Sequence, residues 1–79
     1  MGTRRDGEDT VRKEVERIGR RVAAARAERR LTQEDVATLA GVPAARVSKL
    51  EIAAVAVRID TLTKIAGAVG LRITLEPAA

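Results

Sequence analysis

The chain has 79 residues, of which 46% are hydrophobic and none is aromatic, and its formal charge is +4 without any cysteine or histidine. This length predicts one small domain of marginal stability, in which aliphatic side chains form the core and dimerisation would bury further surface. The composition excludes disulfides, thiolate metal sites and a histidine base, and no apolar run reaches the roughly 18 residues of a membrane span. We therefore expect a cytoplasmic protein that is not an enzyme, with no catalytic or metal site and no cofactor.

The N-terminal part of the chain predicts a tail followed by one helix. Residues 1–9 are polar, contain glycine and have no periodicity, which is typical of a disordered tail. From Thr10 to about Arg30 the spacing of the apolar residues predicts an amphipathic helix. Those residues are Val11, Val15, Ile18, Val22 and Ala25. Residues 10–16 form the first turns of this helix. They either cover a neighbouring subunit or partner protein, or merely reflect an early start of the helix.

The excess of positive charge lies in the same N-terminal part. Residues 1–30 hold ten basic and six acidic residues, whereas the two signs balance in the rest of the chain. This pattern fits either a solvated helix face with pairs of opposite charge or a surface for a polyanionic partner.

Residues 32–51 predict two short helices that meet at Gly41. Thr32 is a good N-cap, and Asp35 can complete a capping box with it. Gly41 ends the first helix, because glycine enters the left-handed conformation without steric cost. The apolar stripe expected for this helix consists of Val36, Leu39 and Ala40.

The second of these helices has one inward seam and one free face. Pro43 suits its first turn, and Val47 and Leu50 point inward. The free face holds Ala44, Ala45, Ser48 and Lys49, with Arg46 at its flank. A short helix with a free face after a glycine turn fits entry into a major groove.

A loop, a further helix and a strand are predicted for the remaining residues. Residues 52–59 read as a loop, with a helical overrun as far as Ala54 as the alternative. Asp60 is a strong N-cap for a helix that Gly70 terminates. Residues 71–76 then alternate apolar and polar side chains up to Pro77, which is a strand pattern.

A single strand in a helical domain leaves its backbone groups unpaired. Pairing with the same strand of a second copy across a two-fold axis would satisfy them. Dimerisation residues in this interpretation are Leu71, Ile73 and Leu75. The alternative is a frayed tail of apolar character.

The segments Leu-Thr-Gln-Glu-Asp-Val-Ala-x-x-Ala-Gly-Val (31–42) and Val-Ser-Lys-Leu-Glu (47–51) closely resemble the Xre-type, phage-repressor-like helix-turn-helix family. The resemblance runs from about Ile18 to Leu71 and implies an all-α domain of four to five helices. With a C-terminal β-strand pairing across a dimer, the outline is similar to HipB-like and HigA-like antitoxins. Domain boundaries follow as a tail at 1–9, a DNA-binding domain at 10–70 and a dimerisation strand at 71–76.

The resemblance also implies a DNA-binding surface, and the sequence departs from the family in two places. Ala44 and Ala45 replace the usual polar side chains and offer only apolar contact to a thymine methyl group, so direct base readout is thin. Ala53 stands where the family usually has glycine, which puts the family's tight exit from the second helix in doubt. The residues implied for DNA contact are Gln33, Pro43, Ala44, Ala45, Arg46, Ser48, Lys49 and Arg58.

These residues have different expected roles. Gln33 contacts a phosphate and supports the recognition helix, or is simply a polar first-turn residue. Arg46 and Lys49 are the strongest candidates, because either can donate to guanine O6 and N7 or hold a phosphate. Arg58 is a phosphate contact, while Glu51 is a structural acid. Weaker candidates are Arg20, Arg21 and Arg26.

The sequence therefore predicts a sequence-specific DNA-binding transcriptional regulator, an antitoxin-like homodimer that represses its own operon from a palindromic operator. Its partners are double-stranded DNA, a second copy and, in the antitoxin reading, a toxin protein, with no membrane involved. One alternative is a toxin-neutralising protein-binding module with minor DNA contact. The other is a phage or restriction-modification controller.

Overall fold

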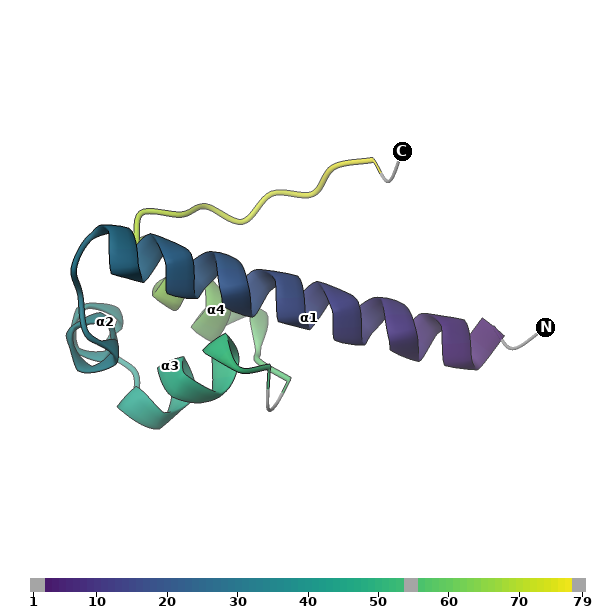
Figure 1. Ribbon diagram of the computed structural model, residues 1–79, viewed down its shortest axis with the longest axis horizontal. Coiled ribbons are helices and arrows are strands. Elements are labelled where there is room, and N and C mark those ends of the chain that lie inside the picture. Colours follow the sequence, from purple (N-terminus) through teal and green to yellow (C-terminus); the bar gives the residue numbers. More distant parts are fainter. Residues whose placement is uncertain (1–2, 54–55, 78–79) are drawn as a thin grey trace.

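The computed structural model describes residues 3–53 and 56–77 and contains four helices. They are α1 (Thr3–Glu28), α2 (Gln33–Ala40), α3 (Ala44–Glu51) and α4 (Ile59–Ala68). Figure 1 shows α2, α3 and α4 gathered against the C-terminal half of α1, while its N-terminal half projects beyond them. None of the helices in the described part of the chain is both long and apolar enough to span a lipid bilayer.

Helix α1 begins at Thr3 instead of Thr10, so residues 3–9, predicted as a tail, are helical. The helix has 26 residues, which corresponds to about 39 Å. Charged side chains help its early turns, since Asp9 pairs with Arg12 and Glu14 with Arg17 at i, i+3. Residues 1–2 of the predicted tail lie outside the described residues.

Helix α2 has the ends that the sequence predicted. The Asp35 amide donates to Thr32 Oγ1 at 2.9 Å, and the Thr32 amide donates to Asp35 Oδ2 at 2.8 Å. Gly41 at the other end has φ +72°, the left-handed conformation. The capping box and the glycine stop are therefore confirmed.

The core-facing side of α2 differs from the prediction. Val36 and Ala37 are buried, whereas Leu39 is 64% exposed. Successive residues turn by about 100° around a helix. Positions 36, 37 and 40 therefore share the side that faces the core, and position 39 lies outside this side. The prediction of Leu39 as a core residue is wrong, and Ala37 takes its place.

A residue in the left-handed conformation follows the end of helix α3. Its N-cap is Pro43, and it ends at Glu51 with Ile52 as the C-cap. Ala53 follows with φ +57°, so the tight exit that the family makes with glycine is kept by an alanine. The suggested overrun of this helix to Ala54 concerns a position outside the described residues.

The alanine in this position has a cost that a substitution can measure. A left-handed conformation costs an L-residue about 1–2 kcal/mol, and glycine avoids this cost. Glycine also makes the unfolded chain more flexible, so the larger entropy lost on folding offsets part of the gain in stability. We expect Ala53→Gly to raise the free energy of unfolding by about 0.5–1 kcal/mol, measured by urea titration followed by circular dichroism. Ala24→Gly, in the exposed interior of α1, should lower it by about as much. A loss of stability in both Ala53→Gly and Ala24→Gly would contradict the left-handed conformation of Ala53.

Helix α4 starts one residue before the predicted N-cap. Arg58 occupies the N-cap position without a side-chain hydrogen bond, and Asp60 lies inside the first turn. The Asp60 carboxylate accepts from the Thr61 amide at 2.8 Å and from Arg58 Nε at 3.2 Å. Asp60 therefore stabilises the start of α4 from within the first turn. Gly70, with φ +78°, follows Val69 at the other end.

All four helices contribute to one aliphatic core. Val22 and Ala25 come from α1, Val47 and Leu50 from α3, and each is at most 2% exposed. The remaining members of the cluster are Val36, Ala37, Ile65 and Val69. Because these side chains are small, the orientation of α3 needs further support, which polar contacts supply.

Residues 71–77 do not form a strand in the described chain. The Leu71 amide donates to Ala66 O at 2.8 Å, but no backbone hydrogen bond joins residues 72–77 to another described residue. Figure 1 shows this extended segment running along α1 in the opposite direction. Leu71 packs against the core, Ile73 is 37% exposed and Leu75 is 97% exposed. Ile73 and Leu75 are therefore not buried within the single chain, and the pairing of this segment with a second copy stays a prediction.

Candidate nucleic-acid interface

The free face of α3 is a continuous surface beside a fully buried seam. Val47 and Leu50 are buried as predicted, with exposures of 0% and 2%. On the outer side, Ala45, Arg46 and Lys49 are exposed, with Pro43 just before the helix. Ser48 is half-buried, and Ala44 is partly buried because it packs against the core. The outer face is thus made by small side chains and two long cations.

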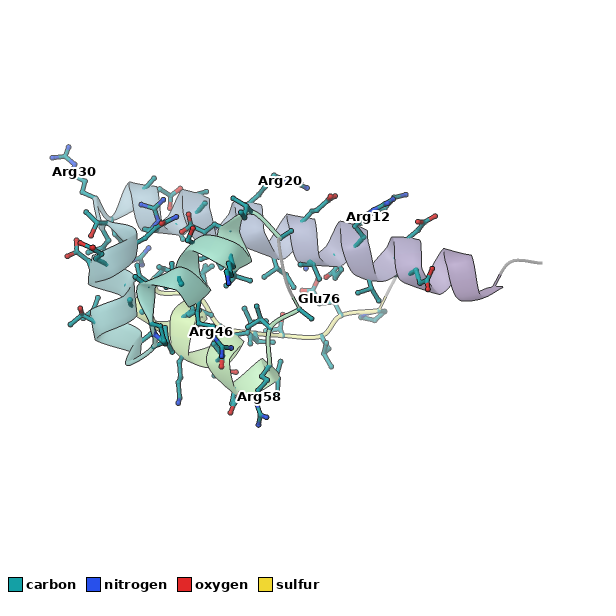
Figure 2. All side chains as sticks on the ribbon, turned by 90° about the horizontal axis from the view of Figure 1, so that it is seen from below. Arg12, Arg20, Arg30, Arg46, Arg58 and Glu76 are labelled. Atoms are coloured by element: carbon teal, nitrogen blue, oxygen red, sulfur yellow. The ribbon has the colours of Figure 1, made fainter. Side chains whose placement is uncertain are left out.

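The two cations of α3 are available for a ligand. None of the ion pairs among residues 3–53 and 56–77 involves Arg46 or Lys49. In Figure 2, Arg46 and Arg58 lie in the lower part of the view, while Arg12 and Arg20 project from α1 near its upper edge. Arg20 and Arg46 therefore project in different directions. We conclude that the cationic surface at the recognition helix depends on few side chains.

Arg58 already has an intramolecular partner. Its Nε lies 3.2 Å from Asp60 Oδ1, and the two side chains are 80% and 56% exposed. The hydrogen bond from Arg58, together with the Thr61 amide, lowers the pKa of the Asp60 carboxyl. An exposed pair of this kind is weak, so a phosphate could take over the guanidinium in competition with Asp60.

A polar cluster ties the end of α3 to α1 and α2. Arg26 donates to Glu51 through Nε to Oε2 at 2.6 Å and through Nη2 to Oε1 at 3.0 Å. Gln33 Nε2 donates to Glu51 Oε1 at 2.9 Å, and Arg26 Nη1 donates to Leu31 O at 2.9 Å. The bidentate geometry makes this pair stronger than a single hydrogen bond. We call Arg26, Gln33 and Glu51 the anchor cluster.

The Glu51 carboxylate stays charged although its side chain is only 7% exposed. Burial raises its pKa, but the hydrogen bonds from Arg26 and Gln33 and the nearby positive charge outweigh burial, so the pKa lies below its usual range. Glu51 therefore acts as the structural acid that the resemblance implied. Arg26, a weak candidate for DNA contact, is engaged in the anchor cluster instead.

Gln33 occupies a position that serves both of its expected roles. It is half-buried, at the first position of α2, and one of its amide hydrogens is used by Glu51. An amide nitrogen carries two hydrogens, so the second remains to donate to an outside acceptor such as a phosphate oxygen. The structure places Gln33 against the end of the recognition helix; its contact with DNA stays a prediction.

Gly19 is a positioning residue that sequence reasoning missed. A Cβ atom at this position of α1 would lie 2.5 Å from Leu50 O and 2.8 Å from Glu51 O, closer than such atoms approach. The backbone of α3 therefore touches α1 at this point. The available signal was a glycine inside an amphipathic helix, where its cost of about 1 kcal/mol relative to alanine calls for a packing reason.

A family model described as helix-turn-helix matches residues 22–75 of the chain, which is more than half of it. The chain therefore belongs to this Xre-like helix-turn-helix family, a family of DNA-binding regulatory domains and not of enzymes. No curated protein and no solved structure shows a significant match to the chain. The matched region starts inside α1, so residues 1–21 precede it.

Proposed function

We propose that this helix-turn-helix regulator is a sequence-specific repressor that places α3 in the major groove of its operator. The observation that carries the proposal is the free face of α3 beside a buried seam. On this face Arg46 and Lys49 are exposed and form no ion pair with any residue that the structure describes. Either cation can donate to guanine or to a phosphate, and Ala45 can approach a thymine methyl group. Phosphate contacts from Gln33 and Arg58 would add affinity without sequence preference.

The second part of the proposal is a homodimer on a palindromic operator. Residues 71–76 of two copies would pair as antiparallel strands. This would supply partners to the backbone groups of residues 72–76, which bond to no other described backbone group, and would cover Ile73 and Leu75. Two recognition helices about 34 Å apart would then enter successive major grooves. Each copy adds its few contacts, which compensates for the small number of base-reading side chains.

In its most specific form, the proposal is that the protein is an antitoxin-like repressor of its own operon. It is supported by the apolar C-terminal segment beyond the helical core, which could also receive a toxin protein. A toxin-neutralising module with minor DNA contact differs from this proposal in that its binding to DNA would not depend on α3.

Binding to DNA should depend on the two cations of α3. We expect Lys49→Ala and Arg46→Ala each to weaken binding to the operator about tenfold, because each substitution removes a contact of about 1–3 kcal/mol. Fluorescence anisotropy with a labelled fragment from upstream of the gene measures the affinity. A salt titration adds a second readout, since each lost phosphate contact reduces the slope of log K against log salt by about 0.9.

Lys13→Ala is the matched control for Lys49→Ala. It removes the same charge from an exposed position of α1, in the half of the helix that projects away from α3. It should leave the affinity nearly unchanged. If both lysine variants bind equally well, α3 does not read the operator and the toxin-binding alternative gains support.

A further inference from the structure

The exposed C-terminal segment carries opposite charges placed symmetrically about one residue. Arg72 and Glu76 each lie two residues along the chain from Thr74, with an apolar residue in between on either side. Residues 72–77 are all exposed, and their backbone groups bond to no other backbone group in the described part of the chain. The segment is therefore available for pairing, and its charge pattern is the same for a strand read in either direction with the signs exchanged.

The end of this segment points successive side chains to different sides, as a strand does. Leu75 is 97% exposed and points away from the domain. Glu76 lies near Arg17 of α1, because it adds to the raised pKa of Arg17, of which the hydrogen bond to Glu14 is the main cause. Figure 1 shows the segment running along this helix. Its extended course suits a ladder with a second strand.

A two-fold axis restricts how the segment can pair with its copy. In an antiparallel ladder, directly opposite side chains lie on the same side of the sheet, and a two-fold axis maps each residue onto its equivalent in the partner. The residue at the axis therefore lies opposite itself. The possible registers differ only in which residue this is, and in each of them odd-numbered residues face odd-numbered ones.

The free backbone amides identify a central residue. The amide of Leu71 is already used, since it donates to Ala66 O at 2.8 Å, and Pro77 has no N–H group. The amides that remain for a partner strand belong to residues 72–76. Thr74 is the middle residue of these five, so an axis at Thr74 pairs all of them with one another.

We propose that a second copy of the chain pairs with this segment in the register that places Thr74 at the two-fold axis. Arg72 then lies opposite the partner's Glu76 at both ends of the ladder, and Ile73 lies opposite the partner's Leu75. Opposite charges and threonine pairs are favourable cross-strand neighbours. The inference rests on the strand-paired dimer proposed above and specifies which residues meet in it.

Other positions of the axis separate the charges or bring like charges together. An axis at Ile73 places Arg72 opposite the partner's Thr74, and Glu76 opposite the partner's Gly70. Gly70 has φ +78°, which lies outside the strand region. An axis at Arg72 brings two arginines together, and a later axis again leaves the two charges apart.

Single cysteine variants test the register, because the chain contains no cysteine and each variant can crosslink only to its own copy. Opposite residues have Cα atoms about 4.5–5.5 Å apart, which a disulfide spans, whereas diagonal neighbours are about 7–8 Å apart. We expect Thr74→Cys to form a covalent dimer under mild oxidation. Ile73→Cys, the matched control at the adjacent exposed position, should crosslink about tenfold more slowly. Non-reducing electrophoresis over time measures both rates.

The other outcomes separate the register from the dimer itself. Crosslinking of Ile73→Cys at an equal or higher rate would overturn the register. If neither variant crosslinks although sedimentation equilibrium shows a dimer, strand pairing is wrong as well. A wild-type chain that remains monomeric at about 100 µM would overturn the dimer from which the register follows.

A change of charge tests the pairing of Arg72 with Glu76 by sedimentation equilibrium. Arg72→Glu places two glutamates opposite each other at both ends of the ladder, so we expect the dimer dissociation constant to rise about tenfold or more. Adding Glu76→Gln to this variant removes the repulsion and should recover most of the loss. A double variant that dimerises no better than Arg72→Glu would show that these two residues do not meet.

Discussion

Replacing Glu51 by alanine is expected to lower the free energy of unfolding by about 2–3 kcal/mol, a large share of the stability of a domain this small. The substitution leaves the Arg26 guanidinium, whose side chain is 22% exposed, without its bidentate partner. Gln33 loses its acceptor as well. Urea unfolding followed by circular dichroism at 222 nm is the suitable measurement, because the chain contains no aromatic residue for fluorescence.

Glu14→Ala provides the matched control. Glu14 also pairs with an arginine, Arg17, but both side chains are more than half exposed. Solvent screens such a pair, so its loss should have little measurable effect on unfolding. Equal effects of the two substitutions would show that the anchor cluster contributes no more than a surface pair.

The anchor cluster also predicts the direction of a pH effect. The pKa of Glu51 is lower in the folded chain than in the unfolded chain, since the hydrogen bonds from Arg26 and Gln33 outweigh its burial. As the pH falls, Glu51 therefore binds its proton more readily in the unfolded chain than in the folded chain. The stabilisation of the fold by the charged Glu51 is complete above its unfolded pKa of about 4.3 and is lost as the pH falls below this pKa. Wild type should lose more stability between pH 7 and pH 3 than Glu51→Ala does.

Gly19→Ala is expected to destabilise the fold by about 1–3 kcal/mol, although alanine is the better helix former. The added Cβ would meet two carbonyl oxygens of α3, at 2.5 Å and 2.8 Å, and backbone atoms cannot rotate away as a side chain can. Relief requires α3 to move away from α1. Operator affinity should fall together with stability, because α3 carries the candidate DNA-binding residues.

Gly67→Ala is the control for Gly19→Ala. Gly67 lies within α4, and a Cβ there would meet nothing within 4 Å. This substitution should raise the free energy of unfolding by about 0.5–1 kcal/mol through the gain in helix propensity. Stabilisation by both alanines would mean that α1 and α3 do not touch at Gly19.

Local signals in the sequence predicted the helix-turn-helix well. Thr32, Asp35 and Gly41 act through their immediate neighbours along the chain, so their effects could be inferred without knowing the fold. The seam of Val47 and Leu50 was predicted for a similar reason, because a short amphipathic helix has only one side to bury. These elements position the free face of α3.

Features that depend on distant parts of the chain could not be predicted in the same way. Arg26 and Glu51 are 25 residues apart, and nothing local indicates that they meet. Leu39 was assigned to the core because periodicity cannot distinguish its side of α2 from the side that holds Ala37. The start of α1 was missed because residues 3–9 are polar, and ion pairs such as Asp9 with Arg12 support the helix there without an apolar stripe.

The separation of the anchor cluster from the free face of α3 has a consequence for evolution. Glu51, Val47 and Leu50 hold the helix in place, while Ala45 and Lys49 contribute nothing to that support. If α3 reads the operator as proposed, exchanges at these outer positions can change the preferred operator without loss of the fold. Such a scaffold can diverge rapidly among duplicated regulators, and it offers a starting point for engineering new DNA specificities into a chain of 79 residues.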